Sequence, residues 1–459
     1  REKTIAATQA AYNLWLSTAY DGSNDLTRHP EIPEVPWAEI IAAAEDAYVP
    51  GHFTAFIGYE WSSAPDGNNL HRVVIYRDGK EEAITRIPLS NYLDEDPEAL
   101  WNWMEDYEAD TGGQLLAIPH NGNLSNGLMF ADQTFSGGAL TSEYARRRKR
   151  FEPVYEVAQM KGDGETHPLL SPDDAFADFE TWDKGSFGAE VKTPGMLPGE
   201  YAREAYRRGL QYQRTLGANP FKFGMIGSTD SHISLSTSRE ENFFGKITAL
   251  EPSAHEMRFN EAITGRLGEE SNQIKAWATS ASDLPRSDFA AYGYAHGVPM
   301  GGNLDPALEN SAPRLLIHTL RDPDGANLDR IQVIKGWLNG DGTSAERVYD
   351  VACGGRAVGA SGCSSAVGDT VDRASATYTN AIGEPLLTAF WEDPDFDPTQ
   401  AAFYYVRVLD IPTPRWTTYD AKIFGVEIPE GAPVSIQERA YTSPIWYSPC
   451  RCKNAAQTV

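Results

Sequence analysis

The sequence lacks the short motifs that would assign an enzyme class directly. No G-x-S-x-G nucleophile motif is present, and no G-x-G-x-x-G dinucleotide motif follows a strand-like run. The four cysteines, Cys353, Cys363, Cys450 and Cys452, all lie in the last quarter of the chain without C-x-x-C spacing, which excludes a zinc finger. A Cys353–Cys363 disulfide closing a Gly/Ser-rich loop would indicate an oxidising compartment, and four separate thiols are the alternative.

Long apolar runs and basic residues are also scarce. No run approaches the roughly 18 to 20 residues of a membrane span. Asp and Glu outnumber Lys and Arg by 65 to 39, and the net charge of −26 repels nucleic-acid phosphates and anionic membranes. The basic run at 145–150, ARRRKR, has no interleaved aromatic residues for base stacking, so we interpret it as the solvated end of a helix. We expect no nucleic-acid partner and no membrane span.

With 459 residues, the chain exceeds one ordinary core, so we expect a large domain and a smaller one. Up to about residue 250, short apolar runs alternate with helical patterns. Strands are expected at 53–61, 72–77, 115–120, 154–160 and 222–228, and helices at 97–110 and 198–217. Because most of these strand runs lack polar alternation, they are typical of a parallel sheet or barrel that is buried on both faces.

The pattern changes after about residue 300. Strand-like runs such as RLLIHTL, LDRIQVIKGWL and AAFYYVRVLDI are separated by turns, with no convincing helix. We therefore predict an α/β domain at residues 1–297 and a β-rich, sandwich-like domain at 298–459.

Carboxylates and imidazoles stand at the ends of the predicted strands, where reactive residues gather in α/β folds. Glu60, His120, Asp230 and His232 follow strand-like runs, and His71 stands at a strand start. Each has a structural alternative. Glu60 could pair with an arginine, His71 and His120 could be loop or turn residues, and Asp230 could cap an Asx-turn.

The Asp230 and His232 pair favours a metal site if GSTDSH, residues 227–232, extends a strand, because side chains two apart then point to one side. Mixed oxygen and nitrogen ligands suit zinc, manganese or iron, and such ions lower the pKa of a bound water. Glu165 and His167 form a second pair of this spacing, for which ligand and helix-entry interpretations both stay open. Lys161, Lys222, Arg72 and Asn121 are the donors best placed to hold an anionic substrate group.

Long stretches of the chain resemble a known family. PGHFTAFIGYEWSS, AIPHNGNLSNGLMF, NPFKFGMIGSTDSHISLSTSREENFFGK and FYYVRVLDIPTPRWTTYDA are similar to a bacterial domain-of-unknown-function family within the polymerase-and-histidinol-phosphatase (PHP) type of metallohydrolases. The resemblance implies a distorted (β/α) PHP-type barrel with roughly two or three divalent metal ions (Zn, Mn or Fe) that hydrolyses phosphate-type or related esters. It also implies that Glu60 bridges metals, that His120, Asp230 and His232 are ligands, and that His71 is a further one.

The sequence departs from this family at two places. The H-x-H strand and the TDH-like motif with which such proteins begin do not occur, and a longer segment is expected where residues 277–288 stand, with the gap near 280–285. We expect that the first strands are missing from this sequence rather than from the gene product, because a barrel without them would expose a large apolar surface.

Two functions stay open. The first is a metal-dependent hydrolase that uses a metal-activated water on a small anionic phosphoric or sulfuric ester. The second is a non-catalytic protein on a decayed barrel that binds a carbohydrate or envelope component through C-terminal aromatics such as Trp416, Trp446 and Tyr447, which interdomain packing would explain equally. We expect a periplasmic or secreted location, or otherwise a cytoplasmic one.

Overall fold

The computed structural model describes residues 31–182, 185–188, 190–235, 237, 239–246, 251–254, 258, 263–264, 269–270, 293–294, 297–304 and 312–449. The predicted gap near 280–285, Cys450 and Cys452 lie outside these residues. The helices are α2 (Glu31–Ala47), α3 (Lys80–Ala83), α4 (Pro97–Thr111), α5 (Ser142–Phe151), α6 (Ala202–Leu216) and α8 (Trp416–Phe424).

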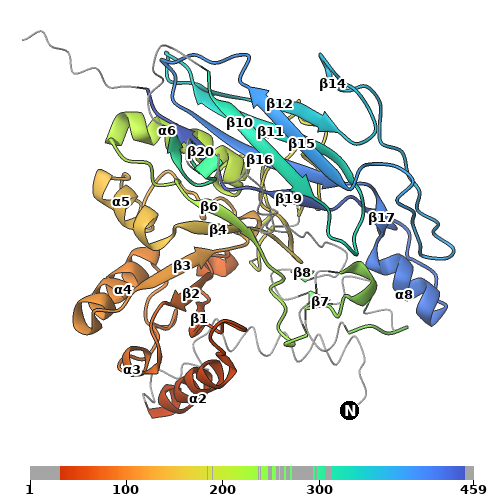
Figure 1. The fold of residues 1–459 in the computed structure, drawn as a ribbon. Coiled ribbons are helices and arrows are strands. Elements are labelled where there is room, and N and C mark those ends of the chain that lie inside the picture. The colour runs from red at the N-terminus through yellow and green to blue at the C-terminus, as the bar shows by residue number, and fades with distance from the viewer. Residues whose placement is uncertain are drawn as a thin grey trace, which may run out of the picture.

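The N-terminal strands are β1 (Gly58–Trp61), β2 (Arg72–Tyr76), β3 (Leu115–Pro119), β4 (Val154–Gln159), β5 (Gly162–Asp163), β6 (Gly224–Gly227), β7 (Ile263–Thr264) and β8 (Glu269–Glu270). The C-terminal strands are β9 (Asn303–Leu304), β10 (Arg314–Leu320), β11 (Leu328–Leu338), β12 (Ser344–Cys353), β13 (Val358–Gly359), β14 (Gly362–Cys363), β15 (Leu386–Glu392), β16 (Ala402–Asp410), β17 (Thr413–Pro414), β18 (Ser435–Ile436), β19 (Arg439–Tyr441) and β20 (Ile445–Tyr447). The chain is therefore a mixed α/β protein, with its C-terminal strands drawn in cyan to blue in Figure 1.

The N-terminal strands do not form the expected parallel sheet. β1 pairs with β2 and β2 pairs with β3, both antiparallel, whereas β4 and β6 are parallel. A single parallel bridge between His120 and Glu156 connects the end of β3 to β4. The described strands form no closed barrel. The prediction of a parallel sheet was wrong for β1 to β3, because β1 is mostly partly exposed and β2 alternates between buried and partly exposed residues, as antiparallel strands with one covered face do.

Helix α4 confirms the prediction for 97–110 and covers one face of β1 to β3. Asp96 caps its N-terminus by accepting a hydrogen bond from the Glu98 backbone N–H at 2.8 Å, and Gly112 ends it with a left-handed φ of 72°. Its buried Leu100 and Met104 belong to the core that also contains strand residues such as Val74. α6 likewise confirms the helix expected at 198–217.

The basic run at 145–150 lies in α5, as predicted, but it is not fully solvated. Arg148 is buried, with its Nε 3.0 Å from a carboxylate oxygen of Glu152, and it donates to the Met129 carbonyl at 2.8 Å. Arg147 pairs with Glu105 across to α4 at 2.9 Å. The basic run therefore attaches α5 to the neighbouring segments through Arg147 and Arg148.

The C-terminal strands form the two packed sheets of a sandwich. A six-stranded sheet has the order β12-β11-β16-β20-β9 with β19 also on β16, and β10 pairs with β15 in a separate sheet. Side chains from both sheets enclose one core, which includes Ile317, Ala389, Val333 and Tyr404. The expectation of no helix after residue 300 was wrong, because α8 follows β17. Its Thr-rich and aromatic sequence has weak helix propensity, and burial of Trp416 against the N-terminal part compensates.

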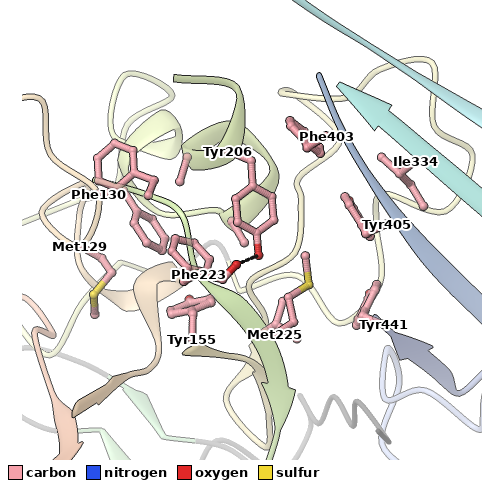
Figure 2. Close-up of a cluster of buried hydrophobic side chains, with 14 of the residues drawn as sticks. Met129, Phe130, Tyr155, Tyr206, Phe223, Met225, Ile334, Phe403, Tyr405 and Tyr441 are labelled. Carbon is pink, nitrogen blue, oxygen red and sulfur yellow. Dashed lines mark hydrogen bonds between the residues drawn. The ribbon is translucent and has the colours of Figure 1, made fainter. Parts of the chain in front are cut away.

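The two parts of the chain share a core across the predicted boundary. In Figure 2, Phe130, Tyr155 and Phe223 face Phe403 and Tyr405 of the C-terminal sheet, with Tyr206 of α6 between them. The C-terminal aromatics that we considered for recognition are buried: Trp416, Trp446 and Tyr447 are 0%, 4% and 2% exposed. Trp446 packs on Tyr206 with ring centroids 5.5 Å apart. Interdomain and sandwich packing therefore explains these aromatics.

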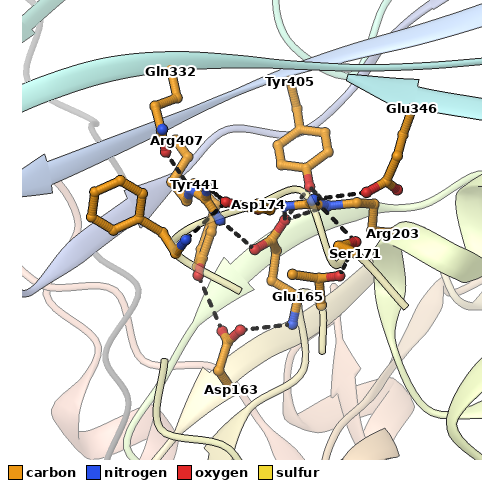
Figure 3. Close-up of polar contacts among 12 residues, drawn as sticks. Asp163, Glu165, Ser171, Asp174, Arg203, Gln332, Glu346, Tyr405, Arg407 and Tyr441 are labelled. Carbon is orange, nitrogen blue, oxygen red and sulfur yellow. Dashed lines mark hydrogen bonds and ion pairs between the residues drawn. The ribbon is translucent and has the colours of Figure 1, made fainter. Parts of the chain in front are cut away.

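A buried ion network also joins the two parts (Figure 3). Arg407 of β16 donates to Glu165 at 3.1 Å and to Asp174 at 2.7 Å, and Arg203 of α6 donates to both carboxylates as well. The Tyr405 hydroxyl donates to Glu165. The side chains of Glu165, Asp174, Arg203 and Arg407 are at most 2% exposed. Glu165 is thus held by Arg203 from the N-terminal part of the chain and by Arg407 from the C-terminal part.

Asp410 at the end of β16 makes stability depend on pH. Burial raises the pKa of Asp410 to about 8, and the nearby Asp322 adds to this effect. Because the folded chain then holds this proton more tightly than the unfolded chain, whose aspartate pKa is about 3.9, the free energy of unfolding should fall as pH rises from about 4 to about 8. We expect Asp410→Asn to raise the free energy of unfolding by about 1–3 kcal/mol at pH 8 and little at pH 4. Urea unfolding at both pH values measures this, and an equal effect at both would contradict it.

Cys353 and Cys363 form a disulfide with 5.8 Å between their Cα atoms, which decides between the two interpretations of this pair. Among the described helices, none is both long and apolar enough to cross a membrane.

Candidate metal centre

Strand pairing brings three of the predicted ligands to one end of the β1–β2–β3 sheet. Trp61 pairs with Arg72, and Arg72 pairs with Pro119. Glu60, His71 and His120 are the sequence neighbours of these residues, so all three lie at the same end. The His120 backbone N–H also donates to the His71 carbonyl at 3.4 Å.

The three side chains converge on one carboxylate oxygen. His71 Nδ1 lies 2.7 Å and His120 Nε2 lies 3.1 Å from Glu60 Oε1. His120 Nδ1 lies 3.5 Å from the Ile118 carbonyl, so its Nε2 is the nitrogen that faces the cluster. The rings of His71 and His120 meet edge to face with centroids 5.6 Å apart. A backbone carbonyl behind an imidazole is the usual support of a metal-binding histidine.

Asp230 and His232 join the same cluster from the loop after β6. His232 Nε2 lies 4.0 Å from Glu60 Oε2, and its Nδ1 lies 3.7 Å from Asp230 Oδ1. The condition that GSTDSH extends a strand is not met, because β6 ends at Gly227 and Asp230 has a left-handed φ of 53°. A non-glycine residue in this conformation costs roughly 1–3 kcal/mol, and such residues concentrate at functional sites. Asp230 therefore lies in a turn and in the cluster at the same time, so the two interpretations of this residue do not exclude each other.

Two lysines and an amide surround Asp230. Lys161 Nζ donates to Asp230 Oδ2, and Lys246 Nζ donates to the same oxygen at 2.7 Å and to His232 Nδ1 at 2.9 Å. Gln159 Nε2 donates to Asp230 Oδ2 at 2.8 Å and to Asn121 Oδ1 at 2.7 Å. Positive charge is thus concentrated beside the carboxylates.

Asn121, which was predicted to hold substrate, lies at this site as well. It is 2% exposed, has a left-handed φ of 52°, and its Nδ2 has no hydrogen-bond partner among the described residues. A buried amide donor without a partner costs about 1–3 kcal/mol, so its persistence indicates a ligand or a water as acceptor.

Neighbouring positive groups lower the pKa of both Glu60 and Asp230, and this effect is larger than the opposing effect of burial. Burial raises the pKa of Glu60, but the charge and hydrogen bonds of His71 and His120 lower it below its usual value. Burial also raises the pKa of Asp230, but Lys161 and Lys246 lower it well below its usual value. Both carboxylates are therefore ionised at neutral pH, which is the form that binds a cation.

Glu156 of β4 is a further carboxylate at this site. It is 6% exposed, forms the parallel bridge to His120, and its Oε1 has no hydrogen-bond partner within the described part of the chain. Burial raises the pKa of Glu156 to about 7, although the charge of His120 opposes this. β4 pairs with the end of β3 and with β6, so the Glu156 backbone lies between the strands that lead to the two groups of ligands.

The other predicted residues are placed elsewhere. Arg72 faces away from His71 because neighbouring strand residues alternate, and it pairs with Glu152 at 3.1 Å. Lys222 precedes β6 whereas Asp230 follows it, and its Nζ donates to Asn303. Glu165 belongs to the interdomain ion network, and His167 Nδ1 accepts a hydrogen bond from the Leu169 backbone at 3.0 Å.

Sequence reasoning missed Glu156, Gln159 and Lys246. The first two carried a signal, because an acid and an amide interrupt the otherwise apolar strand run VYEVAQM. No sequence pattern indicated Lys246. It lies 16 residues after Asp230 and reaches Asp230 and His232 only through the tertiary fold.

The comparison with known families gives one finding. A family model described as a protein of unknown function (DUF3604) matches residues 3–285 and 273–449. Neither the curated proteins nor the solved structures gave a match. The two matched stretches overlap at residues 273–285, which include the position of the gap predicted near 280–285.

Proposed function

This chain belongs to the DUF3604 family of proteins of unknown function, and we propose that it is a metal-dependent hydrolase of phosphoric or sulfuric esters. The convergence of the predicted ligands supports this most. Ligand atoms of Glu60, His71 and His120 lie within 4.8 Å of one another, and so do those of Glu60, Asp230 and His232. Because Glu60 belongs to both groups, its carboxylate would contribute to both ion sites.

The donor set fits a divalent transition metal. Carboxylate oxygens mixed with imidazole nitrogens suit zinc, manganese or iron, and the orphaned Oε1 of Glu156 is a further acceptor that a cation would satisfy. Glu60, His71 and His120 would hold one ion. Asp230 and His232, with Glu60, would hold another. When bound, such ions lower the pKa of a water to make a nucleophile and polarise the ester.

The residues around the ligands suit an anionic ester. Lys161 and Lys246 place their ammonium groups beside Asp230, where they would neutralise the non-bridging oxygens of a phosphate or sulfate. The Asn121 amide would orient the same group. Lys161 and Asn121 thus keep the roles that the sequence predicted, and Lys246 takes the place of Arg72 and Lys222.

We propose that this site is related to PHP-type metallohydrolases, on the grounds of its ligand types and their order along the chain. The antiparallel β1 to β3 then represent a distortion of that barrel. The Cys353–Cys363 disulfide supports a periplasmic or secreted location, because disulfides persist in oxidising compartments.

A metal-reconstitution assay tests the proposed function. Protein stripped with a chelator and then reloaded with zinc, manganese or iron is assayed on nitrophenyl phosphate, bis-nitrophenyl phosphate and nitrophenyl sulfate. We expect hydrolysis only by the loaded protein. If stripped and loaded samples are equally inactive toward all three esters, although elemental analysis shows bound metal, the proposed hydrolase is wrong.

The role of Glu156 as a further ligand has its own test. We expect Glu156→Gln to weaken divalent-metal affinity about 10- to 100-fold, because the amide keeps the shape but removes the charge of a carboxylate at the ligands. Titration of the stripped protein with zinc, followed by calorimetry, measures the affinity. Glu105→Gln, on an exposed carboxylate that pairs with Arg147, is the control and should bind zinc as the unmodified chain does. Equal affinity of both variants would exclude Glu156 from the ligand set.

A further inference from the structure

A cavity of about 570 Å³ lies at the outer edge of the six-stranded C-terminal sheet. It is lined by the edge strand β12, by β11, by the loop at 173–176, by the β13–β14 hairpin and by Trp391 of β15. None of its lining residues belongs to the candidate metal centre. Its volume is within the roughly 300–1,000 Å³ typical of small-molecule sites.

The polar floor of the cavity is preorganised. Asp350 accepts hydrogen bonds from Gln332 Nε2 and Arg330 Nη1, each at 2.8 Å, and from the Cys363 backbone N–H at 2.9 Å. The last bond and the Cys353–Cys363 disulfide both fix the hairpin that borders the cavity. A floor held in this way loses little conformational entropy when a ligand binds.

The wall of the cavity is aromatic. The rings of Tyr349 and Trp391 lie 5.1 Å apart at an angle of 51°, and both side chains are partly exposed. The Phe176 ring also lines the cavity, with the Arg330 guanidinium 4.8 Å from its centroid. Guanidinium groups lie over the rings of Phe176 and Tyr349, so the Trp391 ring is the main apolar surface beside the polar floor.

The charges of the lining are largely neutralised within the protein. Arg330 pairs with Asp350, Arg347 pairs with Asp395 at 2.8 Å, and Asp174 belongs to the interdomain ion network. The lining holds three aspartates and two arginines, so a phosphorylated or sulfated ligand would meet a net negative charge, and a lipid chain would need an apolar lining. The lining instead suits a neutral ligand with many hydroxyl groups and some apolar faces.

We propose that this cavity binds a carbohydrate. Sugar hydroxyl groups both donate and accept, which matches the mixed carboxylate, amide and guanidinium floor, and the C–H faces of a sugar ring pack on aromatic rings. The volume accommodates an oligosaccharide segment of about two or three rings. This site stands independently of the proposed hydrolase, because it uses other residues on the other part of the chain.

Binding of soluble oligosaccharides to the intact chain tests the site. Calorimetric titration with cellohexaose, xylohexaose, laminarihexaose, maltohexaose and chitohexaose is expected to show saturable binding of at least one of them. Trp391→Ala and Tyr349→Ala should weaken that binding at least about tenfold, and Trp391→Phe should retain part of it because a ring remains.

Phe390→Ala is the matched control for these variants. Phe390 is the neighbour of Trp391 on β15 but is 65% exposed and does not line the cavity. Its replacement should leave the affinity unchanged. The proposal is overturned if no sugar of the panel binds at millimolar concentration, or if binding is the same in Trp391→Ala, in Tyr349→Ala and in the unmodified chain. Thermal unfolding of every variant shows whether the variant is folded, so that a loss of affinity can be assigned to the binding site.

Discussion

Replacing Glu60 by glutamine is expected to lower the affinity for divalent metal about 100-fold or more and to abolish ester hydrolysis. Glu60 Oε1 contacts His71 and His120, and its carboxylate belongs to both candidate ligand groups. Glutamine keeps the size of the side chain but removes the negative charge that would bridge two ions. Elemental analysis after dialysis against a weak chelator measures the metal content, and the nitrophenyl esters measure the activity.

The histidines provide a matched pair of controls for this result. His120→Ala should lose metal as Glu60→Gln does, because His120 Nε2 faces the cluster. His167→Ala should retain it, because His167 lies against Tyr201 with ring centroids 5.4 Å apart and bonds the Leu169 backbone. Retention of full metal content by Glu60→Gln, or its loss in His167→Ala with folding intact, would contradict the ligand set.

Replacing Arg407 by methionine is expected to destabilise the chain by about 3–5 kcal/mol, because it leaves buried carboxylates without a counter-charge. Arg407 is 0% exposed and pairs with Glu165 and Asp174, whose side chains are 1% and 2% exposed. The charges of Arg407 and Arg203 also hold the pKa of Asp174 below its usual value, against the opposing effect of burial. Denaturant unfolding followed by circular dichroism measures the loss.

Two further variants distinguish this mechanism from simple loss of packing. Arg407→Met combined with Glu165→Gln should recover part of the stability, because Arg203 and Asp174 then neutralise each other. Arg314→Met removes an ion pair with Glu392 whose side chains are 62% and 49% exposed, and should cost less than about 1 kcal/mol. Equal losses in Arg314→Met and Arg407→Met would contradict the role of burial.

The clustering of the candidate ligands was predictable to the extent that it follows local pattern. Glu60 and His120 stand at ends of apolar strand runs, and the structure brings both together with His71, Asp230 and His232. Arg72 could also have been excluded from the sequence, because it follows His71 on a strand and neighbouring side chains point to opposite faces. Glu156 was visible as an acid within an apolar strand.

Lys246 and the partners of Glu165 were not predictable in the same way. Lys246 contacts Asp230 and His232 only because the chain after β6 folds back. The cations that bind Glu165 are Arg203 of α6 and Arg407 of β16, and Arg407 follows Glu165 by 242 residues. Glu165 and His167 have the same spacing as Asp230 and His232, yet they enter a different environment. Spacing alone therefore does not distinguish a ligand pair from a structural one.

The sequence by itself determined where the strands β1 to β4, β6, β10, β11 and β16 and the helices α4, α5 and α6 form, because hydrophobic periodicity and capping residues are local properties. The tertiary structure decided the antiparallel direction of β1 to β3, the existence of α8 and the burial of Trp416, Trp446 and Tyr447. It also decided which carboxylates meet arginines and which meet imidazoles. These outcomes depend on contacts between distant segments, where burial and charge neutralisation outweigh local propensity.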